Sequence, residues 1–253
     1  METPSRLYEL DPCAPRIIVV GDLHGTFVAC KSAVKYWRAQ TDAFIIFLGD
    51  YADRGSGGAE IIEFLASLSR EKRVVVLKGN HEDYSSSGEP LFYPADFVEE
   101  IRAKKGDWPD YFRSILQPFI ARTYLAALLP GSFLFAHGGV SSQINGIEAL
   151  RHPSRRQEED LLWSDPGDEM GERPNSRGKG VEFGPDITRS VLEKIGVRQL
   201  IRSHQPYLAS GGPHYSHSRS VVTLSSTDVY GGKPFFLELE NRKEGFLSTV
   251  HFV

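Results

Sequence analysis

Residues 76–83 have the sequence VLKGNHED, in which an apolar run stops abruptly at Gly79. Polar residues occupy every position from Asn80 to Asp83. A short apolar run that ends at glycine is typical of a buried β-strand. Such a strand has no structural need of an amide beside an imidazole at its end, so the pair points to chemistry.

Other apolar runs along the chain end in the same way. Together with the first they predict buried strands at RIIVVGD (16–22), AFIIFLGD (43–50), RVVVLKGN (73–80), SFLFAHGG (132–139) and QLIRSHQ (199–205). Helical patterns at residues 26–40, with Thr26 as N-cap, and at 57–72 separate the first three runs. Alternating strands and helices predict an α/β fold with parallel strands and right-handed crossovers.

The remaining segments complete the predicted pattern. We expect helices at 94–106 and 109–131, with Pro118 as a break or first-turn residue, and a loop rich in glycine and charge at 165–185. A helix at 185–196 should end at Gly196, and strands are expected from about residue 213 onward, at 220–226, 234–240 and 246–253. No segment has the composition of an inter-domain linker, so we expect one catalytic domain over residues 1–253.

Composition and charge exclude several classes of protein. The 253 residues are 40% hydrophobic and 25% charged, with a net charge of −4, so there is no overall basis for binding nucleic acid or membranes. The two cysteines, Cys13 and Cys30, form no paired motif and favour a reducing compartment. The N-terminal residues lack the apolar segment of a signal peptide, and no run reaches the ~18 residues of a membrane span. We therefore expect a cytoplasmic protein.

The polar residues that follow the predicted strands form the candidate site. They are Asp22 and His24, then Asp50, Asp53 and Arg54, then Asn80 and His81, then His137, and finally His204. Sites in open α/β sheets form at the carboxyl ends of strands, so these side chains should gather. Mixed Asp, His and Asn ligands suit divalent first-row metals rather than calcium or a structural zinc. Six candidate ligands are too many for one catalytic ion, because such an ion must keep open positions. They suit two ions that share a carboxylate. Enzymes use this arrangement for in-line displacement at phosphorus.

Each of these residues also has an ordinary structural explanation. A single aspartate before glycine is usually a turn former, and a single histidine is usually a satisfied core residue. Those explanations do not account for one pattern repeated at five strand ends. The other histidines follow no such run, and we expect them on the surface: His152, His214, His217 and His251.

The motifs, taken in order, resemble a known family. They are GDLHG (21–25), GDYADRG (49–55), GNHE (79–82), HGG (137–139), WSDP (163–166), NSRGKGVEFG (175–184) and RSHQ (202–205). This ordered set is similar to the signature of the phosphoprotein phosphatase family of serine/threonine phosphatases, over roughly residues 16–230. The short chain resembles archaeal or bacterial members. The resemblance implies a calcineurin-like metallophosphoesterase fold, with two β-sheets in a sandwich flanked by helices.

The resemblance also implies a role for each residue. Asp22, His24 and Asp50 would hold one metal, and Asp50, Asn80, His137 and His204 the other. The phosphate of the substrate would contact Arg54, Arg177, Asn80 and Tyr230. His81 would act as general acid, oriented by Asp53. The implied cofactors are two divalent ions, manganese or an iron/zinc pair, and the implied partner is a phosphoprotein or phosphopeptide. The sequence carries no signal of an oligomeric state.

Elementary chemistry agrees with these roles. Two divalent ions bring more positive charge than Asp22 and Asp50 return, and the surplus would stabilise a hydroxide that bridges them. Neutral Asn80 preserves that surplus. The planar guanidinium group of arginine can donate two parallel hydrogen bonds to phosphate. A departing alkoxide needs a proton, and His81 lies next to a ligand without being one.

Two segments depart from the family's pattern. DYSSSGEPLFYP (83–94) follows GNHE, and SSTDVYGG (225–232) replaces the family's Ser-Ala-Pro-Asn-Tyr-Cys block, with Tyr230 shifted by one position. Because the resemblance implies that the second segment helps to bound the substrate groove and inhibitor site, neither inhibitor sensitivity nor peptide preference is carried over.

Three functions compete. The first is a metal-dependent serine/threonine protein phosphatase that acts without a phosphoenzyme, and WSDP and NSRGKGVEFG favour it. The second is a dinucleoside polyphosphate hydrolase such as a diadenosine tetraphosphatase, which shares the first four motifs. The third, an inactive phosphate-binding module, is disfavoured because every candidate ligand and both arginines are present.

Overall fold

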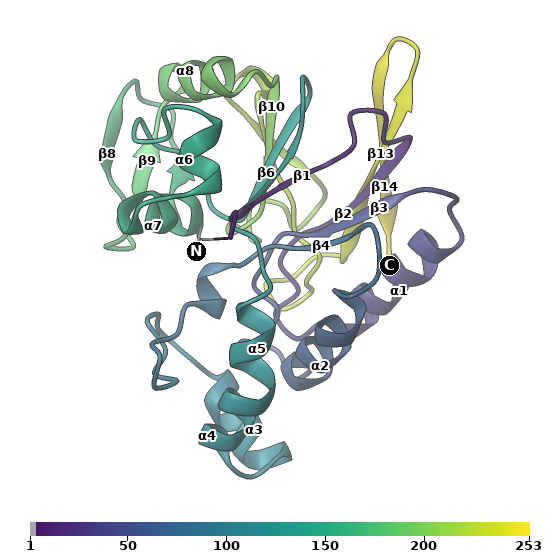
Figure 1. Cartoon of the computed structure of the whole chain (residues 1–253), viewed down its shortest axis with the longest axis vertical. Coiled ribbons are helices and arrows are strands. Elements are labelled where there is room, and N and C mark those ends of the chain that lie inside the picture. Colours follow the sequence, from purple (N-terminus) through teal and green to yellow (C-terminus); the bar gives the residue numbers. More distant parts are fainter. Residues whose placement is uncertain (1–3) are drawn as a thin grey trace.

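Two β-sheets form the centre of the fold in residues 4–253, which the computed structural model describes (Figure 1). The first has five strands in the order β14-β13-β2-β3-β4, and β2, β3 and β4 run parallel, as predicted. Its strands are β2 (Arg16–Val20), β3 (Phe44–Phe47), β4 (Val74–Val76), β13 (Phe235–Arg242) and β14 (Gly245–Phe252).

The second sheet has six strands in the order β1-β5-β6-β10-β12-β11. Strand β10 runs parallel to β6 and β12, so the strand ends that precede His137 and His204 lie at the same edge. Its strands are β1 (Leu7–Glu9), β5 (Ala126–Leu129), β6 (Phe133–Ala136), β10 (Gln199–Arg202), β11 (His214–Ser216) and β12 (Val221–Thr223).

Strand β2 shows why these apolar runs are continuous rather than alternating. Successive side chains of a strand point to opposite faces. Ile17 and Val19 belong to the core between the two sheets, whereas Ile18 and Val20 belong to the core on the outer face. Both faces are therefore buried, and the strand has no solvent side on which polar residues would be favourable.

Helices cover the outer faces of both sheets. Figure 1 shows α1 and α2 beside the five-stranded sheet, α6, α7 and α8 beside the six-stranded sheet, and α3, α4 and α5 together at one end. The predicted sandwich flanked by helices is thus confirmed. The helices are α1 (Phe27–Arg38), α2 (Gly58–Leu68), α3 (Phe97–Lys104), α4 (Trp108–Tyr111), α5 (Gln117–Ile120), α6 (Ile147–Arg151), α7 (Arg155–Trp163) and α8 (Pro185–Ile195).

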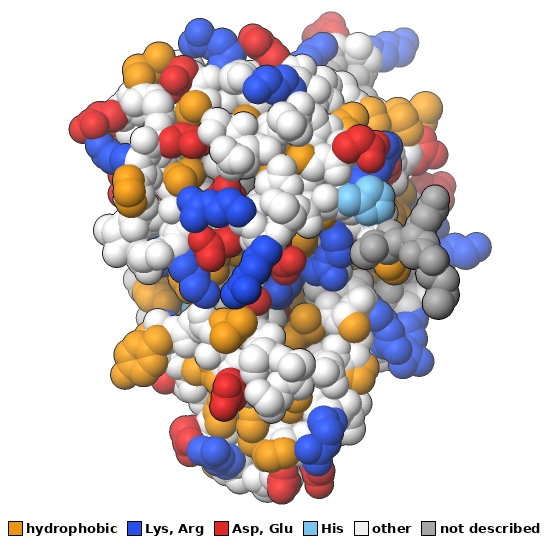
Figure 2. Space-filling view, turned by 60° about the vertical axis from the view of Figure 1, so that its left-hand side comes forward, with side chains coloured by type: hydrophobic (Ala, Val, Ile, Leu, Met, Phe, Trp, Pro, Cys, Tyr) orange, Lys and Arg blue, Asp and Glu red, His pale blue; other side chains and the backbone are white. Residues whose placement is uncertain are grey.

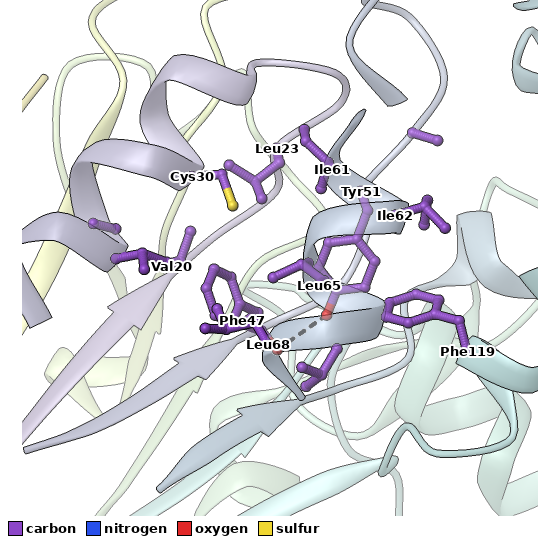
Figure 3. Close-up of a cluster of buried hydrophobic side chains, with 14 of the residues drawn as sticks. Val20, Leu23, Cys30, Phe47, Tyr51, Ile61, Ile62, Leu65, Leu68 and Phe119 are labelled. Atoms are coloured by element: carbon purple, nitrogen blue, oxygen red, sulfur yellow. Dashed lines mark hydrogen bonds between the residues drawn. The ribbon is translucent and has the colours of Figure 1, made fainter. Parts of the chain in front are cut away.

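Tyr51 lies at the centre of the outer core of the five-stranded sheet (Figure 3). It is fully buried, and its hydroxyl donates to the backbone oxygens of Leu77 at 2.6 Å and Phe47 at 3.3 Å. Cys30 packs in the same cluster. Because Tyr51 directly follows Asp50, the packing of its ring fixes the backbone that carries this candidate ligand.

The prediction of one helix over 109–131 is wrong in its second half. The helical part ends at Ile120, and a π-helical turn (Phe112–Leu116) precedes Pro118, which lies in the first turn of α5 as expected. Residues Ala126–Leu129 form the strand β5, paired with β1 and β6. Alanine and leucine favour helix locally, but pairing on both sides and full burial decide for a strand.

The predicted loop 165–185 contains a small sheet of its own. Its three short strands are β7 (Asp165–Pro166), β8 (Glu172–Pro174) and β9 (Val181–Phe183). The helix that follows, α8, ends at Gly196 as predicted, where a φ of 78° places the residue in the left-handed region that glycine adopts freely.

Thr26 precedes α1 as expected, but its side chain forms no cap bond with the helix. The hydroxyl donates instead to the carboxylate of Asp228 at 2.7 Å. This contact joins the start of α1 to the 225–232 segment beside the candidate site.

Candidate metal centre

The two sheets bring together the polar residues that follow their strands. Asp22 and Asp50 follow β2 and β3, and Asn80 lies in the 3-10 turn Asn80–Glu82 after β4. His137 and His204 follow β6 and β10 of the other sheet. The candidate ligands are all at most 4% exposed: Asp22, His24, Asp50, Asn80, His137 and His204. The site therefore lies where the carboxyl ends of both sets of strands meet.

Close backbone approach explains the glycines in this region. Gly49 has a φ of 109°, and a Cβ atom there would lie 2.5 Å from the Cα of Gly79 and 2.9 Å from the Nδ1 of His137. A Cβ on Gly79 would lie 2.3 Å from the Oδ1 of Asp50. Larger residues would separate the strand ends and the ligands that they carry.

Several site residues adopt strained backbone conformations. Their φ values range from 40° to 68°, and they are His24, Asp50, Asp53, Arg54 and His204. Left-handed conformations of non-glycine residues cost about 1–3 kcal/mol each and persist where the surroundings hold them. Such strain is concentrated at functional sites, in agreement with the clustering seen here.

Asp50 is the geometric centre of the site. Its carboxylate lies 3.6 Å from the Nε2 of His24 and 3.4 Å from the Nε2 of His137. Two groups of side chains could each hold a metal, with ligand atoms within 4.8 Å of one another: His24, Asp50 and His81 in one, and Asp50, His137 and His204 in the other. Asp50 belongs to both groups, as a bridging carboxylate would.

The orientation of the imidazoles tests whether a cation fits. The Nδ1 of His137 lies 2.9 Å from the backbone oxygen of Leu48, which can only accept. The Nδ1–H therefore donates there, and the Nε2 of the neutral ring presents a lone pair to the Oδ1 of Asn80, 2.9 Å away. His24 repeats this arrangement, with its Nδ1 donating to the Ala52 oxygen at 3.0 Å. Lone pairs thus face one another with no proton between them, which fits a cation.

The electrostatics of the site lead to the same conclusion. Burial lowers the pKa of His24, His137 and His204 well below the usual range, so the rings are neutral and their lone pairs are available. Burial, followed by repulsion from Asp22, raises the pKa of Asp50 well above its usual range. The carboxylates of Asp22 and Asp50 lack the neighbouring positive charge that divalent ions would supply.

Unpartnered atoms complete the test. Among residues 4–253, the Oδ2 of Asp22 is buried without a hydrogen-bond partner, although its Oδ1 accepts from the His204 N–H at 3.1 Å. The Nδ1 of His204 lies 3.2 Å from the Nε2 of His137 and is the ring atom that meets the other candidate ligands. Burial raises the pKa of Asp22 to about 6. Buried polar atoms without partners are rare and call for an explanation, and ligation supplies one. The predicted set therefore fits divalent metal ions.

His81 and Asp53 form a pair beside these ligands. The Nδ1 of His81 lies 2.7 Å from the Oδ2 of Asp53, whose Oδ1 accepts from the Phe97 N–H at 2.7 Å. The ring of His81 packs between those of His24 and Phe92, with centroids 5.0 and 4.6 Å away. Both carboxylate oxygens of Asp53 are occupied, so the imidazole is held in one orientation.

The two candidate phosphate ligands lie on opposite sides of the centre. The Nε of Arg54 donates to the Tyr230 hydroxyl at 3.2 Å, and the ring of Tyr230 packs against His24 at 5.6 Å. The Nε of Arg177 donates to the carboxylate of Asp165 at 2.9 Å, and its Nη2 lies 3.5 Å from the His204 oxygen. Every residue predicted for the site is therefore near it, including Tyr230, which the motif comparison shifts by one position.

Sequence reasoning missed three charged residues that support the site. Glu82, 1% exposed, accepts from the backbone N–H groups of Asp50, Tyr51 and Gly79 at 2.9–3.0 Å. It joins the ends of β3 and β4. GNHE contains Glu82, but nothing in a linear motif shows which backbone groups it binds.

Asp165 and Arg202 are the other two. Asp165 links Arg177 to the fully buried Arg202, whose Nη2 donates to the Oδ1 of Asp165 at 2.9 Å. WSDP and RSHQ, quoted as motifs, contain these residues. A buried arginine needs a buried acid, but sequence alone does not identify the partner.

The remaining histidines correct one expectation. His152 is exposed, but His214, His217 and His251 are half-buried rather than on the surface. The ring of His217 lies 2.7 Å from the hydroxyl of Thr188 and 2.8 Å from the Gly167 oxygen, and that of His251 lies 2.6 Å from the carboxylate of Glu238. They are structural residues away from the candidate centre.

The molecular surface shows no broad area of one charge on the face in Figure 2, where basic and acidic side chains alternate. Along residues 4–253, no helix combines the length and the apolar character that crossing a membrane requires.

Comparisons with known proteins agree with this geometry. A family model described as calcineurin-like phosphoesterase matches residues 15–208. The chain is similar to a protein serine/threonine phosphatase from Saccharomyces cerevisiae, itself similar to human phosphatase PP5, with 24% identity and a TM-score of 0.77 over 99% of this chain and 84% of that one.

Two further structures share the fold. A candidate diadenosine tetraphosphatase has 15% identity and a TM-score of 0.55 over 98% of both chains. A cold-active protein tyrosine phosphatase has 14% identity and a TM-score of 0.68 over 98% of this chain and 80% of that one. These identities establish a common fold and leave the substrate open.

Proposed function

We propose that this chain, which belongs to the calcineurin-like phosphoesterase family, is a metal-dependent serine/threonine protein phosphatase of the phosphoprotein phosphatase type. The observation that carries the proposal is the juxtaposition of three parts. They are the two ligand groups that share Asp50, the His81–Asp53 pair beside them, and an arginine on either side. Together they can bind a phosphoryl group, neutralise its charge and protonate its leaving group.

The ligand roles divide between two metal positions. Asp22, His24 and Asp50 would hold one ion, and Asp50, Asn80, His137 and His204 the other. Two bound divalent ions would supply positive charge next to the phosphoryl oxygens and lower the pKa of the attacking water. Manganese or an iron/zinc pair suits this mixture of nitrogen and oxygen ligands.

Arg54 and Arg177 bind and orient the phosphoryl group. Within residues 4–253, the Nη2 of Arg54 and the Nη1 of Arg177 have no hydrogen-bond partner and are free to donate to phosphate. Tyr230 and Asp165 hold the two Nε atoms. Asn80 would also contact the phosphate through its side-chain amide. The phosphate would thus be held from both sides while its ester oxygen points away from the ligands.

His81 supplies the proton that the leaving alkoxide needs. If its Nδ1–H donates to Asp53, its Nε2 is the atom that holds and delivers the proton. The phosphorus–oxygen bond breaks as the proton of His81 reaches the departing serine or threonine oxygen. No cysteine takes part, because Cys30 is buried in the core and Cys13 is exposed elsewhere. The attacking group would be the water held by the bound ions, so no phosphoenzyme is part of the scheme.

The same proposal covers the setting of the enzyme. One catalytic domain spans residues 1–253, the partners are phosphoproteins or phosphopeptides, and the location is the cytoplasm. The free state of Cys13 and Cys30 supports a reducing compartment. Asp165 and Arg177, from the motifs that favour a protein phosphatase, both lie at the site and support this choice.

A dinucleoside polyphosphate hydrolase is the second candidate. The similarity to a candidate diadenosine tetraphosphatase over 98% of both chains favours it. An adenine ring needs an accessible aromatic side chain to stack on. Tyr51 is fully buried, and Trp163, 8% exposed, is already covered by Lys179 at 4.9 Å. Tyr230, however, is 41% exposed and packs against His24. Aromatic exposure therefore does not separate the two candidates, and the preference for a protein phosphatase rests on Asp165 and Arg177.

Metal removal tests the proposal. Chelator-treated protein is expected to be inactive on p-nitrophenyl phosphate and on a phosphoserine peptide, and to recover both activities with manganese(II). Metal content is measured in parallel by elemental analysis, which also separates an enzyme from an inactive binding module. Full turnover by metal-free protein would contradict the proposal.

Tyr230→Phe tests how Arg54 is held. Loss of the hydroxyl removes the acceptor of the Arg54 Nε–H, so KM for p-nitrophenyl phosphate should rise by about tenfold, with a smaller change in kcat. The matched control is Tyr207→Phe, which removes an exposed hydroxyl that accepts from Gln205 at 3.4 Å. Equal KM values for the two variants would show that Tyr230 does not position Arg54.

A further inference from the structure

A second cleft lies at the opposite end of the strands from the candidate metal centre. Phe133 and Gln199, the first residues of β6 and β10, line one side, and Leu237 and Leu239 of β13 line the other. The turn between β13 and β14 closes it, so we call it the hairpin cleft. Its volume is about 670 Å³, within the usual range for small-molecule sites. Phe133 is four residues before His137, about 13 Å along the strand direction.

Basic side chains dominate this cleft. Arg198, Arg219, Arg242 and Lys243 line it, and Glu244 is the one carboxylate that residues 4–253 contribute to the lining. Arg242 pairs with Glu240 at 2.7 Å, but in the part of the chain described here Arg198, Arg219 and Lys243 form no ion pair. The protein as a whole has a net charge of −4. A local excess of positive charge in an acidic protein repels itself and attracts an anion.

A strained turn fixes one of these arginines. His217, Ser218 and Arg219 have φ values of 49°, 54° and 70°, three consecutive non-glycine residues in the left-handed region. Such conformations persist only where contacts enforce them. The Gln199 side chain donates to the Arg219 oxygen at 2.6 Å, and the ring of His217 is held by Thr188 and Gly167. The turn therefore has external support on both sides.

The side chain of Arg219 is ordered as well. Its guanidinium lies 3.9 Å from the centroid of the Tyr215 ring, a cation–π contact at the cleft wall. A guanidinium held flat on a ring keeps its edge free for hydrogen bonds. An arginine ordered in advance loses less entropy when it binds an anion.

We infer that the hairpin cleft binds a small, multiply charged phosphate compound. The phosphate groups of this compound bind to Arg198 and Arg219. Guanidinium groups match phosphate oxygens with paired hydrogen bonds, and Lys243 adds a further charge at the rim. The cleft's volume of about 670 Å³ favours a small molecule over an extended acidic peptide. This site is separate from the metal centre and does not depend on the proposed function.

Calorimetric titration with inorganic pyrophosphate tests the inference. The full-length, metal-loaded protein is used, with magnesium in excess of the probe so that the metal centre is not stripped. The Arg198→Ala/Arg219→Ala double variant should bind pyrophosphate at least about tenfold more weakly than the wild type. Its turnover of p-nitrophenyl phosphate should be unchanged. ADP should bind about as well as pyrophosphate if phosphate groups, rather than a base, are recognised.

Three further variants locate the binding. Arg38→Ala/Arg102→Ala removes two arginines with side chains that are both 57% exposed, on α1 and α3, and should leave the affinity unchanged. Arg54→Ala should also retain binding of pyrophosphate in the hairpin cleft, because this substitution changes only the metal centre. Arg198→Lys/Arg219→Lys keeps the charge and should retain part of the affinity, even if the alanine variant folds poorly.

Several results would overturn the inference. They are no binding by the wild type at millimolar pyrophosphate, equal affinity in the wild type and the alanine double variant, loss of all binding in Arg54→Ala, and binding of a polyglutamate peptide in place of pyrophosphate.

Discussion

The Asp50→Asn variant is expected to hold fewer than two divalent ions and to hydrolyse p-nitrophenyl phosphate at least about 100-fold more slowly than the wild type. Asp50 belongs to both groups of potential ligands, with His24 and His81 on one side and His137 and His204 on the other. Groups that only orient metal ligands cost about 10–100-fold when changed, so a shared ligand should cost more. The amide of asparagine also removes the negative charge that neighbouring cations need.

Metal counting on the purified variant checks this expectation. Asp22→Asn is the matched comparison, because Asp22 is an equally buried carboxylate that is proposed to bind one ion rather than both. It should retain more metal than Asp50→Asn. Thermal unfolding without metal controls for folding, since removing an unpaired buried charge should not destabilise the metal-free protein. Two ions per chain in Asp50→Asn would refute the bridging role.

His81→Asn is expected to keep the metals and lose about 10²–10⁴-fold in turnover, the usual effect of removing a general acid. The Nδ1 of His81 faces Asp53 at 2.7 Å, which leaves the Nε2 to serve the leaving group. Asn80, one position earlier, points to His137 at 2.9 Å. The adjacent residues Asn80 and His81 thus face different partners, which fits Asn80 as a metal ligand and His81 as the general acid.

The leaving group provides the decisive comparison. p-Nitrophenol departs without much help, whereas phenol requires a proton, so the loss in His81→Asn should be larger on phenyl phosphate than on p-nitrophenyl phosphate. Asp53→Asn should show the same pattern more mildly, because Asp53 orients His81 without donating itself. His152→Asn alters an exposed histidine and is the control. Equal losses on both substrates would exclude the acid role.

The candidate site could be predicted because its residues share one local signal. Asp22, Asp50, Asn80, His137 and His204 each follow an apolar strand, and parallel strand ends meet by geometry. The residues next to each strand end were therefore enough to predict that these side chains meet in the folded protein. The family resemblance added Arg177 and Tyr230, which lie on loops where no periodicity applies.

The supporting contacts could not be predicted in this way. Glu82 accepts from the backbone N–H groups of Asp50 and Tyr51 through tertiary contacts, and Asp165 meets Arg177 and Arg202 across separate elements. Phe92 reaches the His81–Asp53 pair from the 83–94 segment, which departs from the family's pattern, and Phe97 reaches it from the start of α3. Their partners lie far away in sequence, and a single sequence contains no record of the pairing.

The error in β5 has a related cause. Residues 124–129, YLAALL, have a strong local preference for helix, yet the strand between β1 and β6 buries every side chain of Ala126–Leu129. Tertiary pairing overrides local propensity when the segment is buried on all sides.

The central claim is tested most directly by comparing kcat/KM on phosphoserine and phosphothreonine peptides with kcat/KM on diadenosine tetraphosphate, for the same manganese-loaded preparation. We predict that at least one phosphopeptide exceeds diadenosine tetraphosphate, and that Tyr230→Phe and His81→Asn lower the phosphopeptide value. A value for diadenosine tetraphosphate well above that for every phosphopeptide tried would contradict the account and assign the site to dinucleotide hydrolysis.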